Sequence, residues 1–374
     1  MLKRIYDNLE KTLKQNKVLI IYGPRRVGKT TLLNNFLSQT KLNYKFDSGD
    51  SIRIQNILSS NNFSEILDYV SGYELIAIDE AQQIPNIGAG LKIIVDQCSK
   101  IFVIATGSSS FDLSQQVGEP LTGRKNTIIL YPISQKELNL KYNKYELKEQ
   151  LEDFLIFGSY PEILTAKTKK AKQTILNELV DSYLLKDILS LEKVKSPQVL
   201  LNLLKLLAFQ IGSQVSVNEL AAQLKLDIKT VDRYLDLLEK SFIILKISGF
   251  NRNLRKEIAK KSKYYFLDNG IRNAVISQFN KLENRNDVGA LFENFIILER
   301  IKKQFFNNFN KFYFWRTYDQ QEIDFIEERN GKLFGYEIKW GINKRIKPPK
   351  DWFKTYDNAE FKVINRNNYL DFIL

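Results

Sequence analysis

The stretch KVLIIYGPRRVGKT, residues 17–30, decides the fold of the first part of the chain. Its first six residues form a short apolar run rich in β-branched side chains, which predicts a strand buried in a parallel sheet. Gly23 and Gly28 then permit a tight backbone path that turns successive N–H groups toward phosphate oxygens. A helix expected from Lys29 adds the positive end of its dipole. The stretch therefore predicts a phosphate-binding loop between a strand and a helix.

Two side chains of this loop have specific expected roles. Lys29 is expected to reach the β- and γ-phosphates of a nucleoside triphosphate, and the Thr30 hydroxyl to bind Mg²⁺. The amphipathic segment that follows, residues 31–37, makes a chance glycine-rich turn the weaker interpretation. We therefore predict ATP and Mg²⁺ as ligands of this loop. The residues expected to contact them are Gly23, Pro24, Arg25, Arg26, Val27, Gly28, Lys29, Thr30 and Thr31.

Two further apolar runs end in polar side chains that suit this chemistry. Residues 75–78 (LIAI) precede Asp79 and Glu80, and residues 101–105 (IFVIA) precede Thr106. Because the carboxyl ends of parallel strands meet at one edge of a sheet, these side chains are expected beside the loop. Asp79 is predicted to hold the hydration shell of Mg²⁺, Glu80 to orient or deprotonate the attacking water, and Thr106 to sense the γ-phosphate. Solvated strand ends and helix capping are the alternatives.

These patterns resemble the AAA-type ATPases that carry a catalytic glutamate after the strand aspartate. They resemble more closely a bacterial and archaeal family whose first half reads GPRRVGKT, DEAQ and TGSS and whose second domain is poorly characterised. The matching stretches here are residues 23–31, 79–82 and 106–109. The resemblance continues through LTGR at 121–124 and FGSYP at 157–161, so it covers most of the chain.

The resemblance also assigns a role to Arg124, which follows a glycine-containing loop. It implies that Arg124 stabilises phosphate charge, either in its own subunit or in a neighbouring one, as an arginine finger does. The alternative is an ordinary surface arginine. The neighbouring-subunit version implies a homo-oligomer as one possible assembly.

The middle of the chain has helix-turn-helix spacing. Residues 215–224 predict one helix, which Ser216 is placed to cap, and residues 228–238 predict a second after a short break. Residues 242–247 predict a strand of a wing. In DNA-binding examples the second helix enters the major groove, which would present Lys229, Thr230 and Arg233 to DNA. The same helix carries several aspartates, so a protein-binding module is the alternative.

The last part of the chain resembles the restriction-endonuclease-like fold. A helix at 291–300 precedes three strands at 312–317, 322–328 and 332–340. The fold's active-site pattern is a helix Glu, an Asp at the second strand and Glu-x-Lys on the third. The matching residues are Glu293, Asp324, Glu337 and Lys339.

Glu337 and Lys339 lie two apart and therefore on one face of their strand. Carboxylates that converge there would hold Mg²⁺, and Lys339 would position or activate water for phosphodiester hydrolysis. Two alternatives stay open, an active nuclease and a scaffold that has kept the fold without the activity. A nearby basic and aromatic tract predicts phosphate and stacking contacts, or else a solvated surface. It comprises Lys339, Trp340, Lys344, Arg345, Lys347, Lys350 and Trp352.

The length of 374 residues exceeds that of one ordinary domain, and we expect an α/β chain of three domains. Residues 1–145 would form an AAA-type P-loop ATPase domain with a parallel sheet. Residues 146–280 would form a helical lid and a winged helix. Residues 281–374 would form an α/β restriction-endonuclease-like domain.

The composition excludes several kinds of chemistry. The chain has no histidine and one cysteine, which excludes histidine-based triads and internal disulfides. No apolar run approaches the roughly 20 residues that span a bilayer, so a cytoplasmic protein with no membrane partner is expected. The balance of 56 Lys and Arg against 43 Asp and Glu gives a net charge of +13, which favours polyanionic partners.

Two hypotheses for the function follow. The first is an ATP-driven switch or motor whose second half binds nucleic acid, DNA first of all, with nuclease activity left open; such a protein would serve DNA maintenance or defence. The second is a signalling ATPase whose later domains bind protein partners. The net charge and the four nuclease-like residues favour the first, and the acidic residues on the second helix of the middle part favour the second.

Overall fold

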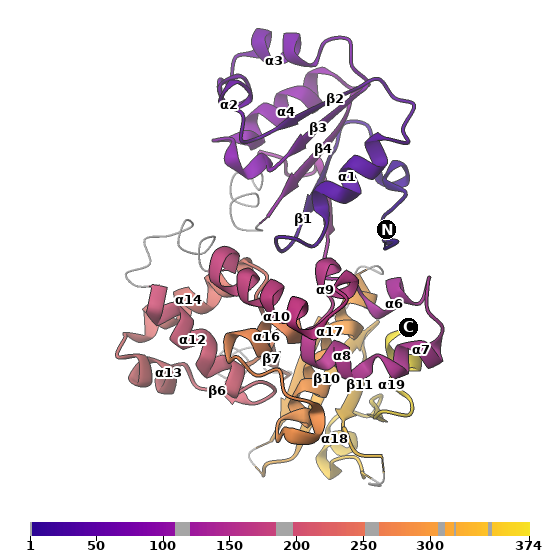
Figure 1. Cartoon of the computed structure of the whole chain (residues 1–374), viewed down its shortest axis with the longest axis vertical. Coiled ribbons are helices and arrows are strands. Elements are labelled where there is room, and N and C mark those ends of the chain that lie inside the picture. Colours follow the sequence, from indigo (N-terminus) through magenta and orange to yellow (C-terminus); the bar gives the residue numbers. More distant parts are fainter. Residues whose placement is uncertain are drawn as a thin grey trace. The chain divides into compact units, whose positions relative to one another are not determined.

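The computed structural model describes residues 2–108, 120–184, 197–250, 262–305, 311–317, 319–342 and 346–374. Ser109 of the TGSS pattern, and Lys344 and Arg345 of the basic tract, lie outside these ranges. The chain divides into two compact units (Figure 1). The first comprises Met1–Pro132 with Lys240–Phe242, and the second comprises Ile133–Glu239 with Ile243–Leu374. The boundaries expected at residues 145 and 280 remain predictions.

The first unit contains a five-stranded parallel sheet, which confirms the α/β fold expected of this part. The order of its strands is β2-β3-β4-β1-β5. Because all five strands run in one direction, the segments after β1, β3 and β4 meet at a single edge. The strands are β1 Val18–Tyr22, β2 Tyr44–Ser48, β3 Leu75–Asp79, β4 Phe102–Gly107 and β5 Lys125–Ile129.

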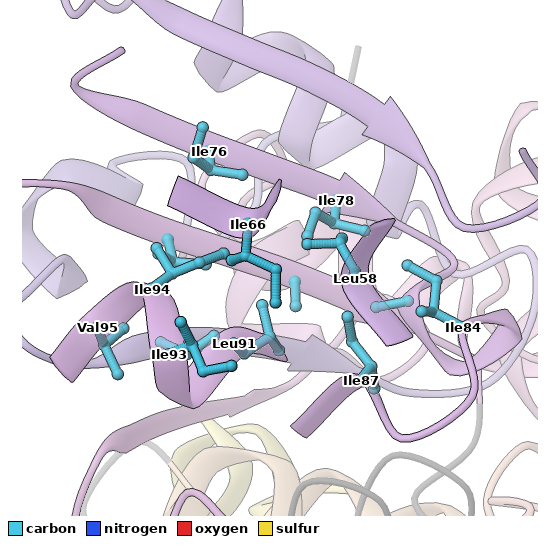
Figure 2. Close-up of a cluster of buried hydrophobic side chains, with 14 of the residues drawn as sticks. Leu58, Ile66, Ile76, Ile78, Ile84, Ile87, Leu91, Ile93, Ile94 and Val95 are labelled. Atoms are coloured by element: carbon cyan, nitrogen blue, oxygen red, sulfur yellow. The ribbon is translucent and has the colours of Figure 1, made fainter. Parts of the chain in front are cut away.

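Helices cover both faces of this sheet, with α1 on one face and α2, α3 and α4 on the other (Figure 1). Figure 2 shows the second face, where side chains of β3 such as Ile76 and Ile78 pack against Leu58, Ile66 and Leu91 from the helices. This apolar layer fixes β3 and therefore the position of Asp79 at its end. The elements are η1 Leu9–Thr12, α1 Lys29–Leu37, α2 Ile52–Ser59, α3 Phe63–Val70, η2 Ala81–Gln83 and α4 Ile87–Gln97.

The second unit contains a mixed seven-stranded sheet in the order β12-β11-β10-β9-β7-β8-β6. Strands β7 and β8 of the middle part pair antiparallel, and β7 also pairs parallel with β9 of the last part. The wing strand and the nuclease-like strands are therefore parts of one sheet. The strands are β6 Gln214–Val215, β7 Ile244–Gly249, β8 Ser262–Phe266, β9 Lys311–Arg316, β10 Glu322–Arg329, β11 Lys332–Ile338 and β12 Glu360–Ile364.

The helices of the second unit include the two predicted for the helix-turn-helix and the long helix predicted before the nuclease-like strands. Their bounds are α6 Gln135–Leu138, α7 Lys144–Glu149, α8 Leu151–Phe157, α9 Pro161–Thr165, α10 Lys169–Glu178, the π-helix η3 Leu179–Leu184, α12 Pro197–Phe209, α13 Val217–Leu224, α14 Ile228–Lys240, α16 Asn269–Val275, η4 Leu282–Asn284, α17 Val288–Phe305, α18 Lys350–Thr355 and α19 Tyr369–Ile373.

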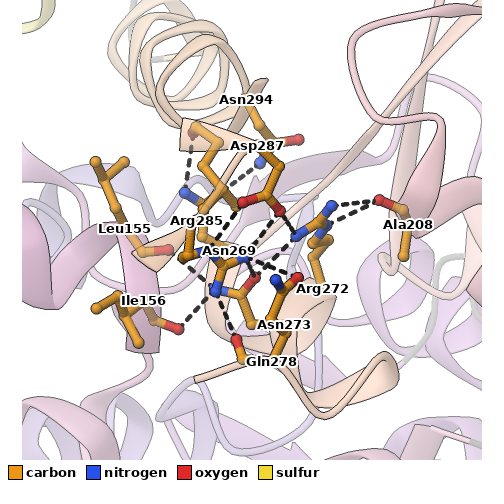
Figure 3. A network of polar contacts seen from close by, with 11 residues as sticks. Leu155, Ile156, Ala208, Asn269, Arg272, Asn273, Gln278, Arg285, Asp287 and Asn294 are labelled. Carbon is orange, nitrogen blue, oxygen red and sulfur yellow. Dashed lines mark hydrogen bonds and ion pairs between the residues drawn. The ribbon is translucent and has the colours of Figure 1, made fainter. Parts of the chain in front are cut away.

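A buried polar network joins several of these helices (Figure 3). The guanidinium of Arg272 donates to the Ala208 carbonyl at the end of α12 and pairs with Asp287. The Asn273 amide donates to the carbonyls of Leu155 and Ile156 in α8, at 3.0 and 2.8 Å. Buried polar groups must be paired to be tolerated, so this network fixes how α8, α12 and α16 pack. Among the described residues, no helix combines the length and apolar character that crossing a bilayer requires.

Candidate functional site

The phosphate-binding loop follows β1 in the first unit, as the sequence predicts. Gly23 has a φ of 153°, and a Cβ there would lie 2.1 Å from the Leu130 carbonyl oxygen, so only glycine fits. Gly28 has a φ of 95° and is the N-cap of α1. The loop therefore ends at the positive end of a nine-residue helix, where backbone N–H groups attract an anion.

Lys29 lies inside this loop with only 5% of its surface exposed. Its Nζ donates to the carbonyl oxygens of Gly23 and Pro24, at 2.9 and 2.8 Å. These contacts hold the ammonium group within the curve of the loop, where a phosphate would be bound. A lysine buried this deeply needs such partners, and phosphate oxygens would offer stronger ones.

Thr30 and Asp79 lie side by side at the carboxyl edge of the sheet. The Thr30 hydroxyl donates to Asp79 Oδ2 at 2.8 Å. The Thr106 hydroxyl, which is fully buried, donates to the other carboxylate oxygen of Asp79. Thr106 Oγ1 also accepts the Glu80 N–H at 3.2 Å. Thr106 thus uses its hydroxyl to contact two acidic residues, and its predicted role as a sensor of the γ-phosphate stays a prediction.

Glu80 has an unusual backbone that directs its side chain. Its φ of 50° lies in the left-handed region, which costs a non-glycine residue about 1 kcal/mol or more. Gly49, after β2, packs against it closely, since a Cβ there would lie 2.3 Å from the Glu80 carbonyl oxygen. The Gln82 amide donates to the Glu80 carboxylate and, at 3.2 Å, to Ser108 Oγ. Gln82 belongs to the DEAQ stretch, whereas nothing in the sequence pattern indicated the contact of Gly49.

These side chains fit a Mg²⁺–nucleotide complex. The Thr30 hydroxyl and the Asp79 carboxylate present hard oxygen donors next to each other, which are the ligands that Mg²⁺ prefers. The glycine-lined loop and the Lys29 ammonium lie beside them. The described residues therefore provide both a phosphate cradle and oxygen donors for the cation that neutralises the phosphates.

Arg124 lies away from this group of residues. Its carbonyl accepts the Val18 N–H at 2.8 Å, which places it at the beginning of β1 and β5. The phosphate-binding loop follows the other end of β1, so Arg124 is at the opposite edge of the sheet. Its guanidinium pairs with Asp96 near the end of α4. This placement speaks against the expectation that Arg124 acts on a nucleotide in its own subunit.

The two segments predicted as the helices of a helix-turn-helix form α13 and α14 in the second unit. Ser216 Oγ accepts the Glu219 N–H and caps α13, and Lys225 makes the turn with a φ of 55°. Antiparallel strands β7 and β8 follow α14. The exposed side of α14 carries charges of both signs, namely Lys229 and Arg233 together with Asp232 and Asp236.

The four nuclease-like residues surround one point in the second unit. Lys339 Nζ lies 2.7 Å from Glu337 Oε1 and 3.5 Å from Asp324 Oδ2, and the Ile338 N–H donates to Asp324 at 2.9 Å. Glu293 approaches Asp324 from α17. Burial raises the pKa of Glu293 to about 7, and the nearby Asp324 charge contributes to that rise. Burial and Asp324 also raise the pKa of Glu337.

A divalent cation does not fit this cluster as it stands. Within the described ranges, no three carboxylate or thiolate side chains lie close enough together to hold one metal ion. A fifth residue that the sequence did not indicate, Lys263 of β8, places its ammonium among the carboxylates. One oxygen, Glu337 Oε2, is buried with no hydrogen-bond partner. We therefore derive no metal-dependent step at these residues.

The surface near the cluster differs in part from the predicted basic and aromatic tract. Trp352 is fully buried in the apolar cluster of the second unit, so it does not stack with a ligand. A cavity of about 960 Å³ lies nearby, between β7, β9 and α18. Arg316 and Lys354 line it, and Arg316 also approaches Glu322 at 3.4 Å.

The FGSYP stretch at residues 157–161 has a structural explanation. Gly158 has a φ of 73°, and a Cβ there would lie 1.8 Å from a carboxylate oxygen of Asp268. The Ser159 N–H donates to Asp268 at 2.7 Å, and Asp268 also caps α16 through the Gly270 and Ile271 N–H groups. The turn is therefore shaped around a buried carboxylate.

The parallel sheet and the phosphate-binding loop give the first unit a P-loop α/β fold, and its sequence is similar to AAA-type ATPase domains. Residues 15–139 match the family described as "AAA domain". Residues 148–282 and 288–369 match two other families, each described as a domain of unknown function, DUF8612 and DUF4143.

Several proteins resemble the whole chain. Uncharacterized protein MJ1544 of Methanocaldococcus jannaschii is 27% identical, over 98% of this chain and 86% of the relative. Uncharacterized protein Rv2008c of Mycobacterium tuberculosis is 26% identical, over 88% of this chain and 72% of the relative. The structure of the Walker-type ATPase PABY2304 of Pyrococcus abyssi has a TM-score of 0.50 and 16% identity, covering 74% of this chain and 96% of that chain. This last likeness concerns the fold alone.

Proposed function

We propose that the chain hydrolyses ATP in a Mg²⁺-dependent reaction at the carboxyl edge of the first sheet. The observation that carries the proposal is the hydrogen-bonded series Thr30–Asp79–Thr106–Glu80 beside the phosphate-binding loop. In this proposal Asp79 would serve the cation and Glu80 the attacking water, with the Thr30 hydroxyl next to Asp79. The match of this segment to the AAA domain family supports it.

Each residue has a distinct role in this proposal. Lys29 would exchange its two carbonyl partners for phosphate oxygens, while the loop N–H groups bind the same phosphates. Thr30 and Asp79 would hold Mg²⁺, which supplies neutralisation of phosphate charge when bound. Glu80, oriented by its left-handed backbone and by Gln82, would accept a hydrogen bond from the attacking water.

We further propose that the second unit binds nucleic acid and that ATP hydrolysis responds to this binding. The helix-turn-helix, the antiparallel strands after it and the net charge of +13 support a nucleic-acid partner. The cavity lined by Arg316 and Lys354 adds basic side chains. We do not extend the proposal to phosphodiester cleavage, because the carboxylate cluster does not fit a divalent cation as it stands.

The alternative, a signalling ATPase whose second unit binds proteins, rests on a specific observation. The exposed side of α14 carries two acidic and two basic residues, and a face with no excess positive charge gains little from DNA phosphates. Both proposals share the ATPase, so they differ only in what stimulates it.

Steady-state ATP hydrolysis with Mg²⁺, with and without single-stranded and double-stranded DNA, separates the two. Glu80→Gln serves as the control that keeps nucleotide binding and loses hydrolysis. We expect DNA to raise the turnover of the parent several-fold and to leave the variant inactive. Hydrolysis that ignores DNA would reject the nucleic-acid proposal, and hydrolysis that persists in Glu80→Gln would reject the role of Glu80.

A further inference from the structure

Lys263 is an unusual residue for its position. All five residues of β8 are buried, and the Lys263 side chain is 1% exposed. An ammonium group removed from water this completely is tolerated only when it is paired. Lys263 is therefore expected to have negatively charged partners close to its ammonium group.

Carboxylates from two elements surround the Lys263 ammonium. Its Nζ lies 2.7 Å from Glu322 Oε1 and 3.7 Å from Asp324 Oδ1, both on one face of β10. Glu293 Oε1, from α17, lies at 3.6 Å. Tyr265, two residues along β8 and hence on the same face, donates its hydroxyl to Glu293 at 2.7 Å.

The same carboxylates are the ones that a nuclease of this fold would use for its metal ion. Glu293 and Asp324 both belong to the predicted set, and the ammonium already supplies a positive charge between them. A divalent cation bound there would lie next to a buried ammonium and would take away its partners. Both effects oppose metal binding, because like charges repel strongly where water is excluded.

The three carboxylates also favour the charged form of the Lys263 side chain. Burial by itself would lower the pKa of Lys263, but Glu293, Asp324 and Glu322 together raise it above the ordinary value.

We propose that the Lys263 ammonium is the resident cation of this cluster, in place of a divalent metal ion. The cluster is then a metal-free group of ion pairs that connects β8 to β10 and α17. Lys339, whose side chain is 45% exposed, lies at the edge of the cluster and not among its buried carboxylates. The proposal concerns the second unit only and is independent of ATP hydrolysis.

The test measures Mn²⁺ binding to the full-length chain without nucleotide, by titration calorimetry. The parent carries Asp79→Asn, so that the nucleotide site does not contribute. We expect no Mn²⁺ binding that depends on Asp324 in the parent. We expect Lys263→Met to gain one Mn²⁺ site per chain and to lose it again when Asp324→Asn is added.

Lys339→Met is the matched control, since it removes the other lysine of the cluster. It is expected to bind no additional Mn²⁺. Mn²⁺ binding in the parent that Asp324→Asn abolishes would overturn the proposal, as would a site gained in Lys339→Met and absent from a folded Lys263→Met. If Lys263→Met does not fold, Mn²⁺ binding is compared between the parent and Asp324→Asn alone. Equal Mn²⁺ binding in the two supports the resident ammonium. Mn²⁺ binding that is lost in Asp324→Asn rejects it.

Discussion

A single hydroxyl, that of Thr106, connects the two acidic residues proposed for ATP hydrolysis. It donates to the Asp79 carboxylate and accepts the backbone N–H of Glu80, so one side chain contacts both residues. The TGSS pattern would then be retained for positioning as well as for contact with nucleotide. This distinction is open to a direct test.

We expect Thr106→Val to lower ATP turnover by about tenfold to a hundredfold while nucleotide binding is kept. Valine has nearly the same shape but removes the hydroxyl that donates to Asp79 Oδ1, while Thr30 still donates to Oδ2. A hydrogen bond to a charged group contributes about 1.5–3 kcal/mol. Turnover and nucleotide affinity are measured separately. Thr127→Val, on the exposed side of β5, is the matched control and should have no effect. Equal turnover in both variants would contradict the positioning role.

At the scale of structural elements, the turn at FGSYP and the helix α16 depend on one carboxylate. Asp268 is buried and accepts N–H groups from Ser159, Gly270 and Ile271. Burial raises its pKa from 3.8 to about 6 although these hydrogen bonds oppose the change. Since the folded chain holds this proton more tightly than the unfolded chain, the stabilising contribution is present at low pH and is lost as the pH rises through 6.

We therefore predict a pH-dependent cost for Asp268→Asn. The variant should unfold more easily than the parent at every pH. Its NH₂ group cannot accept a hydrogen bond, so at least one of the three backbone N–H groups loses its acceptor. The difference in unfolding free energy should be larger at pH 4.5 than at pH 7.5, by about 2 kcal/mol. Urea unfolding at both pH values measures it, with exposed Asp357→Asn as the control. A difference that grows toward pH 7.5 would mean that the pKa of Asp268 is lowered instead.

Many helices and strands were predicted correctly because each depends on a pattern within a short stretch of sequence. The apolar runs before Gly23, Asp79 and Thr106 correspond to β1, β3 and β4, and the helix-turn-helix spacing corresponds to α13 and α14. The single sheet of the second unit was not predicted, because the pairing of Ser248 with Tyr313 joins distant segments that have no shared pattern.

The residues of the candidate sites were also predictable only where a local sequence pattern indicated them. Lys29 and Thr30 belong to a motif of fixed spacing, and Asp79 follows the apolar run at residues 75–78. The role of Lys263 was not predicted. A lysine in a short apolar run is typical of an edge strand, and the three carboxylate partners of Lys263 come from other elements. Arg124 was assigned by resemblance, which carries no information about the edge of the sheet at which it lies.

At the scale of the whole molecule, Arg124 can act on ATP only across a contact between chains. Its pairing with Asp96 is partly exposed, and such pairs contribute about 1 kcal/mol or less. We expect Arg124→Ala to leave the turnover of the monomeric protein within about twofold of the parent. Turnover is measured across a dilution series with the assembly state followed by gel filtration. A large loss of turnover in the monomer would show that Arg124 reaches its own nucleotide.

The continuous sheet of the second unit limits which segments of such a chain can be exchanged by gene rearrangement. The Phe250 N–H donates to the Phe314 carbonyl at 2.6 Å, next to the pairing of β7 with β9. A gene rearrangement that exchanged the wing for another would open this edge and leave its hydrogen bonds unsatisfied. The segments at 148–282 and 288–369, although they match separate families, are therefore expected to descend as one piece, whereas the ATPase domain has its own complete sheet and is free to recombine.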